Sequence, residues 1–170
     1  MHSEQGIKII RYDPNLNQEN FSKLEEAYLN LLNEKDSLKF LSESNLLFDS
    51  NTISSFLKNA HSEEVEYNVA LTTADEIIGV SAFKCDVIKG FDIIGVVVDQ
   101  NYRLKGIGNA LINKGIEEAD KKGFKAVDIS VFADNRSMLI LLIKLGFKPI
   151  KIENHARFDG EDLVHLKKYL

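Results

Sequence analysis

Hydrophobic residues recur along the chain with two different spacings, which predict strands and helices in alternation. Short runs rich in β-branched and aromatic residues predict strands at residues 7–11, 67–72, 76–84, 93–98, 126–131, 147–151 and 162–170. Apolar residues three or four positions apart predict helices at residues 19–33, after 51 or 52, at 106–122 and at 138–145, the last buried because it is almost entirely apolar. Segment 38–48 is apolar without a clear period, so the pattern leaves it unassigned. Because a helix joins strands 93–98 and 126–131, we expect these two strands to be parallel.

Residues 93–110, IIGVVVDQNYRLKGIGNA, combine a buried strand, a polar connector and a glycine-rich helix start. Gly106 and Gly108 let backbone N–H groups of the first helical turn approach a ligand, because no Cβ stands in the way. These unpaired N–H groups and the helix dipole favour a phosphate. Arg103 and Lys105 add positive charge to the same turn. The alternative is that the glycines only shape the connection between the strand and the helix.

The composition indicates a soluble globular protein, since 44% of the residues are hydrophobic and 28% are charged. The 170 residues are enough for one domain, spanning 1–170, and too few for two comfortable ones. The net charge of −5 and the lack of a basic run argue against a nucleic-acid partner and fit an amine substrate. Cys85 is the only cysteine, and the sequence has no leader pattern and no apolar run of membrane length. We therefore expect a cytoplasmic protein with no membrane partner.

Two motifs lie at a fixed distance from each other along the chain. Residues 103–108, RLKGIG, fit the pattern Arg/Gln-x-x-Gly-x-Gly/Ala, and Asn135 with the later Gly146 and Phe147 follows at a matching distance. Both motifs resemble those of the GNAT N-acetyltransferases. The resemblance implies an α/β GNAT fold with a mixed central sheet and helices on both faces. It also implies an enzyme, an acyltransferase with acetyl-CoA as co-substrate. Such an enzyme acetylates a primary amine of a small molecule or peptide by direct attack in a ternary complex.

The resemblance also implies a cofactor site along the central strand, which bulges and separates from the strand after it. Gly95 interrupts the strand where such a bulge is expected. The pantetheine arm would bind along the exposed backbone, and the pyrophosphate would bind N–H groups of the glycine turn. The implied cofactor-binding residues are Val96, Val97, Val98, Arg103, Leu104, Lys105, Gly106, Ile107, Gly108, Asn109 and Asn135. Asn135 is equally well placed to cap the helix that follows it.

Asp92 lies where histone-acetylating members of the family carry their base carboxylate, so the resemblance implies that it deprotonates the amine. Alternatively, it is a solvent-facing aspartate at a strand end. A backbone N–H of Val97 or Val98 would polarise the thioester carbonyl. The sequence departs from the family at Leu142, seven residues after Asn135, where many members carry a tyrosine as general acid. The remaining candidates for the acid are Tyr102, Tyr169, Ser137 and a water molecule.

Other classes of protein explain the sequence less well. A dinucleotide-binding oxidoreductase also places glycines at a strand-to-helix turn, but Leu111 stands where the fingerprint requires its third glycine. The histidines are scattered without metal-site spacing, so we expect no metal. The serious alternative is a catalytically silent GNAT-like module that binds acetyl-CoA, which the missing tyrosine favours. Because family members often dimerise, a homodimer is one expectation. Aromatic residues expected either beside the acceptor or in the core are Tyr28, Phe40 and Phe48.

Overall fold

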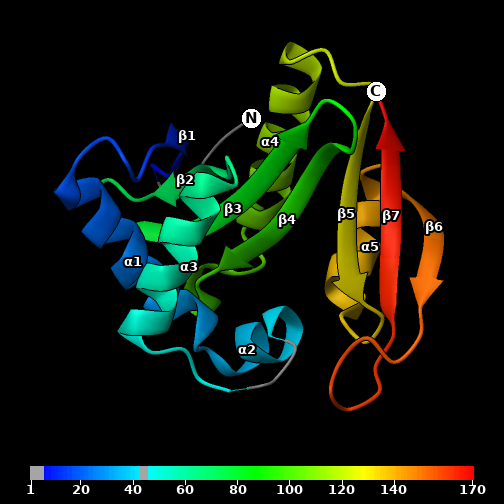
Figure 1. Ribbon diagram of the computed structural model, residues 1–170, viewed down its shortest axis with the longest axis horizontal. Coiled ribbons are helices and arrows are strands. Elements are labelled where there is room, and N and C mark those ends of the chain that lie inside the picture. The colour runs from blue at the N-terminus through cyan, green and yellow to red at the C-terminus, as the bar shows by residue number, and fades with distance from the viewer. Residues whose placement is uncertain (1–5, 43–45) are drawn as a thin grey trace.

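The computed structural model of the protein describes residues 6–42 and 46–170. Within this part of the chain, seven strands form one sheet in the order β1-β2-β3-β4-β5-β7-β6 (Figure 1). The strands are β1 Lys8–Tyr12, β2 Glu66–Leu71, β3 Ile77–Asp86, β4 Gly90–Val98, β5 Ala126–Phe132, β6 Lys148–Glu153 and β7 Leu163–Tyr169. The helices are α1 Gln18–Leu32, α2 Lys35–Leu41, α3 Ser50–Ser62, α4 Ile107–Lys121 and α5 Arg136–Lys144, with a 3-10 turn η1 Gln100–Tyr102. Neighbouring strands are antiparallel except β4 and β5, which are parallel as predicted.

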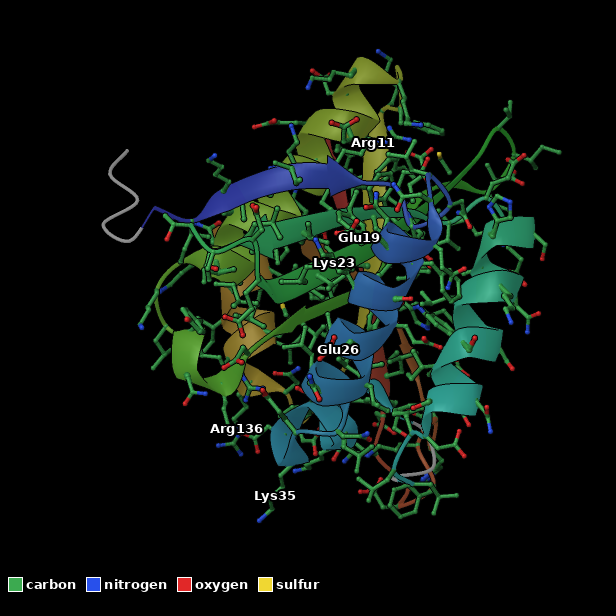
Figure 2. All side chains as sticks on the ribbon, turned by 90° about the vertical axis from the view of Figure 1, so that its left-hand side faces the viewer. Arg11, Glu19, Lys23, Glu26, Lys35 and Arg136 are labelled. Carbon is green, nitrogen blue, oxygen red and sulfur yellow. The ribbon has the colours of Figure 1, made fainter. Side chains whose placement is uncertain are left out.

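Helices cover both faces of this mixed sheet, as expected (Figure 1). α1 and α3 pack on one face, where Leu24 and Leu57 are buried against β2 and β3. α4 packs on the opposite face, where Leu111 is fully buried. The outer side of α1 is charged, and Glu19 and Lys23 form an ion pair at 2.9 Å there (Figure 2). Two separate cores result because successive strand side chains point to opposite faces.

β4 is the central strand, and it separates from β5 part-way along its length. The two strands pair only where residues 91–93 lie beside residues 127–129. β4 also bulges, because Phe83 of β3 faces Ile93 whereas Ala82 faces Gly95, which leaves one extra residue between them. Within the described chain, residues 96–98 pair with β3 and have no partner on the β5 side. We call this divergence the β4–β5 fork, and it confirms the bulge and the separation expected there.

Two expectations about the N-terminal helices need correction. The segment without a clear period contributes to helix α2, which ends at Leu41, whereas residues 43–45 lie outside the described chain. α3 begins earlier than expected, because Asp49 caps it instead of residue 51 or 52. The Asp49 carboxylate accepts a hydrogen bond from the Thr52 N–H at 2.7 Å.

The prediction that residues 138–145 form a buried helix was wrong about burial. Leu142 is fully buried in α5, but Ile140 and Ile143 are 55% and 57% exposed. Only one side of this short helix lies against the sheet, so its apolar composition does not report its burial. β3 also extends two residues further than predicted, through Cys85 and Asp86, and the hairpin turn occupies residues 87–89.

Candidate functional site

The glycine turn between β4 and α4 has a backbone conformation that bulky residues rarely adopt. Leu104 has a φ of 61° and Gly106 a φ of 80°, both in the left-handed region. Leu104 is also fully exposed, so no apolar contact of its side chain offsets the cost of about 1–2 kcal/mol for this conformation. Strain of this kind persists where the surrounding structure holds it, and it is concentrated at functional sites.

The first turn of α4 presents N–H groups to an open space. Among the described residues no side chain caps this helix, and its first bond runs from the Ala110 N–H to the Gly106 carbonyl at 2.9 Å. The N–H groups of residues 107–109 therefore have no intrahelical partner and lie at the positive end of the helix dipole. A Cβ on Gly106 would meet nothing within 4 Å, and one on Gly108 nothing closer than 4.0 Å. The turn can therefore receive an anion such as a pyrophosphate.

Arg103 connects the glycine turn to the end of β4 and to the start of α2. Its Nε donates to the Val98 carbonyl at 2.9 Å. Its second terminal nitrogen donates to a carboxylate oxygen of Glu34 at 2.5 Å and to Ser37 Oγ at 3.0 Å. Burial raises the pKa of Glu34, although the Gln100 N–H and the Arg103 charge both oppose this. The guanidinium is thus directed toward α2 and not into the open space before α4.

Lys105 and Asn135, two further residues expected at the cofactor, lie at the starts of different helices. Lys105 Nζ is 5.1 Å from the centroid of the Tyr102 ring, which is within the range of a cation–π contact. Asn135 is the N-cap of α5, and its Oδ1 accepts hydrogen bonds from the Met138 N–H and Ser137 Oγ, both at 3.3 Å. The helix-capping role of Asn135 is confirmed, and its contact with a cofactor stays a prediction.

Asp92 lies in β4 one residue before the fork opens, beside Asp128 of β5. Ile93 and Ile129 point into the core under α4, so the two carboxylates lie on the opposite face, in a pocket of about 460 Å³. The side chain of Asp92 is exposed at the pocket surface. Partial desolvation by the pocket and repulsion from Asp128 raise the pKa of Asp92 to about 6, while His165 acts in the opposite sense. Such a carboxylate is mostly ionised at neutral pH and can accept a proton.

The pocket wall carries a hydrogen-bonded chain across three strands, which sequence reasoning missed. Ser130 Oγ lies 2.8 Å from His165 Nδ1, and His165 Nε2 lies 3.3 Å from Glu153 Oε2. Beside them, Asp128 pairs with Lys167 at 2.9 Å. The register of β5 against β7 brings these side chains together. The polar–apolar alternation of β5 indicates one polar face but does not identify the partners of its residues.

The residues considered for acid catalysis and for the acceptor wall are distributed over the whole molecule. Leu142 belongs to α5 and is fully buried in the core. The position at which many family members carry a tyrosine therefore does not face the pocket. Tyr169 is 68% exposed at the end of β7. Tyr28 is buried in the α1 core, which confirms a packing role, and desolvation raises its pKa well above the usual value. Phe40 and Phe48 are half-buried.

Arg157, in the loop between β6 and β7, is a buried arginine that the sequence analysis did not single out. It donates to both carboxylate oxygens of Asp134 at 3.1 and 2.7 Å and to those of Asp159 at 2.8 and 3.0 Å. It also donates to the Lys39 carbonyl at 3.2 Å. The guanidinium lies over the Phe132 ring, 4.9 Å from its centroid. These contacts join α2 to the end of β5 and to the β6–β7 loop.

α2 therefore bridges the two arms of the fork. Arg103 ties its start to the end of β4, and Arg157 ties its last turn to the end of β5. In Figure 1, α2 lies at the lower end of the molecule, between the β4 and β5 sides. Lys35, its first residue, projects outward at the lower end of Figure 2. α2 thus connects the ends of the two strands that form the fork, and none of its residues lines the pocket at Asp92.

The thiol of Cys85 is half-buried beside Glu66, and desolvation raises its pKa, which disfavours a nucleophilic thiolate. The part of the chain that the structure describes holds no group of three or more His, Cys, Asp or Glu side chains placed to bind a metal ion. Over the same residues, no helix is both long and apolar enough to cross a membrane.

Two parallel strands that separate beside a glycine-rich helix start, with a carboxylate at the point of separation, define a domain of the GNAT class. The sequence profile of the acetyltransferase (GNAT) family matches residues 26–147, which is most of the chain. This chain belongs to that family.

Individual relatives agree over parts of the chain. An N-alpha-acetyltransferase of Sulfurisphaera tokodaii is 34% identical over 77 residues, which are 44% of this chain and 46% of that protein. An uncharacterized N-acetyltransferase of Methanocaldococcus jannaschii is 40% identical over 57 residues, which are 34% of this chain and 25% of that protein. The chain thus spans less than half the length of these two curated relatives.

Solved structures agree over nearly the whole fold at low identity. A ribosomal-protein-alanine N-acetyltransferase from Brucella melitensis has a TM-score of 0.73 at 20% identity, covering 96% of this chain and 99% of that one. A proposed acetyltransferase from Salmonella typhimurium, solved with its cofactor acetyl-CoA, has a TM-score of 0.73 at 16% identity, covering 96% and 94%. At such identities the likeness establishes the fold alone.

Proposed function

We propose that this chain is an acetyl-CoA-dependent N-acetyltransferase that acts on a primary amine by direct attack in a ternary complex. The observation that carries the proposal is the fork, with the glycine turn at one end of the unpaired β4 edge and Asp92 at the other. Membership of the GNAT family, and the acetyl-CoA bound to the Salmonella protein, support acetyl-CoA as the co-substrate.

The fork and the turn offer the donors and the space that this cofactor needs. The backbone of residues 96–98 would hold the pantetheine arm, since its β5 side is unpaired. The N–H groups of residues 104–109 would hold the pyrophosphate, with Lys105 adding charge and Arg103 setting the position of the turn. Asn135 would contact the cofactor arm from the β5 side of the fork. When bound, acetyl-CoA supplies an activated acetyl thioester whose thiolate is a fair leaving group unaided.

Asp92 accepts the proton of the attacking amine in this mechanism. A pKa of about 6 leaves its carboxylate ionised at neutral pH yet more basic than an ordinary aspartate. Because Asp92 is exposed at the pocket surface, it can pass this proton on to water. A backbone N–H of Val97 or Val98 polarises the carbonyl that is attacked.

Calorimetric titration with acetyl-CoA, NADH and ATP tests the cofactor assignment. We expect micromolar binding of acetyl-CoA alone. Gly108→Trp places a large side chain in front of the turn and should abolish this binding. Gly108→Ala is the matched control, because a Cβ there meets its neighbours only at 4.0 Å. Circular dichroism verifies that both variants fold, and failure of the wild-type protein to bind acetyl-CoA would remove the proposal.

A catalytically silent acetyl-CoA-binding module is the second candidate, favoured by the burial of Leu142 where many family members carry a tyrosine. Thiol release from acetyl-CoA in the presence of a panel of amines separates the two. Release that depends on both the amine and Asp92 identifies an enzyme. Binding of acetyl-CoA without release above the hydrolysis background identifies the module.

The expected homodimer and cytoplasmic location stay predictions. All six residues of β6, an edge strand of the sheet, are exposed, so its free edge is the place where a second copy would pair. Sedimentation of the purified protein, compared with an Ile152→Lys variant on that strand, tests the dimer.

A further inference from the structure

The proposed transfer leaves open which group protonates the departing sulfur, because the residues considered for this role lie elsewhere. Tyr102 packs against the core under α4. Ser137 Oγ is bonded to Asn135 at 3.3 Å, at the start of α5. Tyr169 pairs with Ala126 at the start of β5, whereas the fork opens at the other end of that strand. An acid would have to lie on the pocket face, where β4 and β5 begin to separate.

Ser130 is the first residue of β5 beyond its last pair with β4. That pair joins Ile93 to Ile129, and we call it the closed end of the fork. Ile129 and Val131 point into the core under α4, so Ser130 between them points to the pocket face, where it is exposed. Asp92 lies on the same face, one residue before the closed end. The Ser130 hydroxyl is therefore placed beside the point where the two strands separate.

The proposed cofactor arm brings its thioester to this point. The arm would run from the glycine turn back along β4 residues 98 to 96, which have no partner on the β5 side within the described chain. Its acetyl end would then lie over Gly95, between residue 96 and the closed end of the fork. A Cβ on Gly95 would meet nothing within 4 Å, so this place is open. Ser130 faces it from β5, the opposite arm of the fork.

Ser130 is bonded to a group that can supply a proton. Its Oγ lies 2.8 Å from His165 Nδ1, and His165 Nε2 lies 3.3 Å from Glu153 Oε2. An imidazolium carries a proton on each ring nitrogen, so His165 in this form donates to Ser130 and Glu153 at once, and Ser130 can direct its own proton toward the fork. The charged side chains that face the ring from the strands of this face are Asp92, Asp128, Lys151, Glu153 and Lys167. Of these, Glu153 contacts the ring, and Asp128 is paired with Lys167 at 2.9 Å.

We propose that Ser130 is the general acid of the transfer, and that His165 replaces the proton that Ser130 gives to the departing sulfur. In this step the amine nitrogen bonds to the acetyl carbon as the C–S bond breaks, and Asp92 takes the proton that the amine loses. Ser130 passes its hydroxyl proton to the sulfur and takes the Nδ1 proton of the His165 imidazolium. His165 ends neutral and regains a proton from water, since its side chain is 27% exposed. The inference rests on the proposed acetyl transfer and assigns the acid that Leu142 does not supply.

Single-turnover thiol release from acetyl-CoA, with a saturating amine, measures the transfer step itself. We expect Ser130→Ala to lower its rate constant by about 10-fold or more and to leave the affinity for acetyl-CoA unchanged. This loss is below the typical contribution of an acid, because a thiolate leaves fairly well unaided. Ser55→Ala, the same change on the exposed surface of α3, is the matched control. An unchanged rate constant for Ser130→Ala overturns the inference.

The pH profile of the same rate constant separates a proton source from a merely structural role of His165. The wild-type rate should fall as the pH rises and His165 loses its proton. His165→Gln should be slower at neutral pH and lack this decrease, whereas the decrease at acidic pH, which depends on Asp92, should remain. His61→Gln on α3 is the control and should keep both decreases. A wild-type profile with no decrease at alkaline pH, or a decrease that His165→Gln leaves in place, overturns the inference.

A further measurement needs no amine. CoA and desulfo-CoA differ only in the thiol, so NMR compares their effects on the imidazole signals of His165, which are assigned by their loss in His165→Gln. We expect CoA to shift the pH titration of His165 and desulfo-CoA to shift it much less. Equal effects of the two ligands overturn the inference. A difference between them supports it even if no amine promotes thiol release, a result that would refute the proposed enzyme and not the placement of the sulfur beside Ser130. If the protein binds neither ligand, the proposed function fails and this inference fails with it.

Discussion

The contacts of Arg157 predict a large and selective loss of stability when this side chain is replaced. Its side chain is 2% exposed and lies between Asp134, the Lys39 carbonyl and the Phe132 ring. Arg157→Met keeps a similar length and apolar stem but removes the guanidinium. Asp134 retains Lys39 as a partner at 3.0 Å, so its carboxylate is not left without a cation.

The expected loss in the free energy of unfolding is about 3 kcal/mol. Hydrogen bonds to charged groups contribute about 1.5–3 kcal/mol each, but the remaining Lys39 contact and partial exposure reduce the bidentate Asp134 term to about 2 kcal/mol. The contact with the Phe132 ring adds about 1 kcal/mol. A loss of this size lowers Tm by about 6–12 °C for a chain of this length.

Urea denaturation followed by circular dichroism measures this loss. Arg136→Met is the matched control, because Arg136 is exposed at the start of α5 (Figure 2) and should change stability by less than about 0.5 kcal/mol. Arg157→Lys should fall between Arg157→Met and the wild-type protein, since one ammonium group does not reproduce the planar fork. A loss below about 1 kcal/mol for Arg157→Met would refute the reasoning.

The pH dependence provides a second check on the same contacts. Hydrogen bonds from Arg157 and Lys39 hold the pKa of Asp134 below its ordinary value of 3.8. A carboxylate with a lowered pKa stabilises the folded state above the ordinary pKa, and this contribution is lost as the pH falls through the lowered value. The stability difference between wild-type and Arg157→Met should therefore be full at neutral pH and shrink on acidification below 3.8.

Three further predictions concern the turn and the base. Because the pKa of Asp92 is raised to about 6, kcat/KM should fall as the pH drops below that value. Asp92→Asn should remove this decrease at acidic pH and lower kcat/KM by about 100-fold or more. A pH profile that Asp92→Asn leaves unchanged would exclude Asp92 as the base. Arg103→Ala and Glu34→Gln should both weaken acetyl-CoA binding by about threefold to tenfold in calorimetry, because Arg103→Ala removes the contacts of the turn with α2 and Glu34→Gln removes the charged partner among them. Tighter binding by Glu34→Gln would show instead that Arg103 contacts the phosphates. Gly106→Ala should cost about 1 kcal/mol in urea denaturation, because its φ of 80° strains any residue with a Cβ, and no loss would contradict this account.

Local sequence patterns were sufficient for the elements that form through neighbouring residues. The β-branched run before Gly106 predicted the central strand, and the apolar spacing after it predicted α4. Both predictions succeeded because the spacing of apolar residues within one continuous segment distinguishes a strand from a helix. The parallel pairing of β4 with β5 followed from the helix between them. The same local logic failed for α5, since the exposure of Ile140 depends on what covers the helix and not on its own composition.

The pocket and the bridge across the fork were decided only by the tertiary structure. Asp92 meets Asp128, and Ser130 meets His165, because strand register places them side by side, and a shift of one residue would turn each side chain to the other face. Arg157 is separated from the Lys39 carbonyl by 118 positions in the chain, and no local pattern connects them. The sequence by itself therefore determined the strand, the glycine turn and the helix at which we propose that the cofactor binds. The tertiary structure decided which charges meet around Asp92, because pairing between distant strands depends on how the whole sheet assembles.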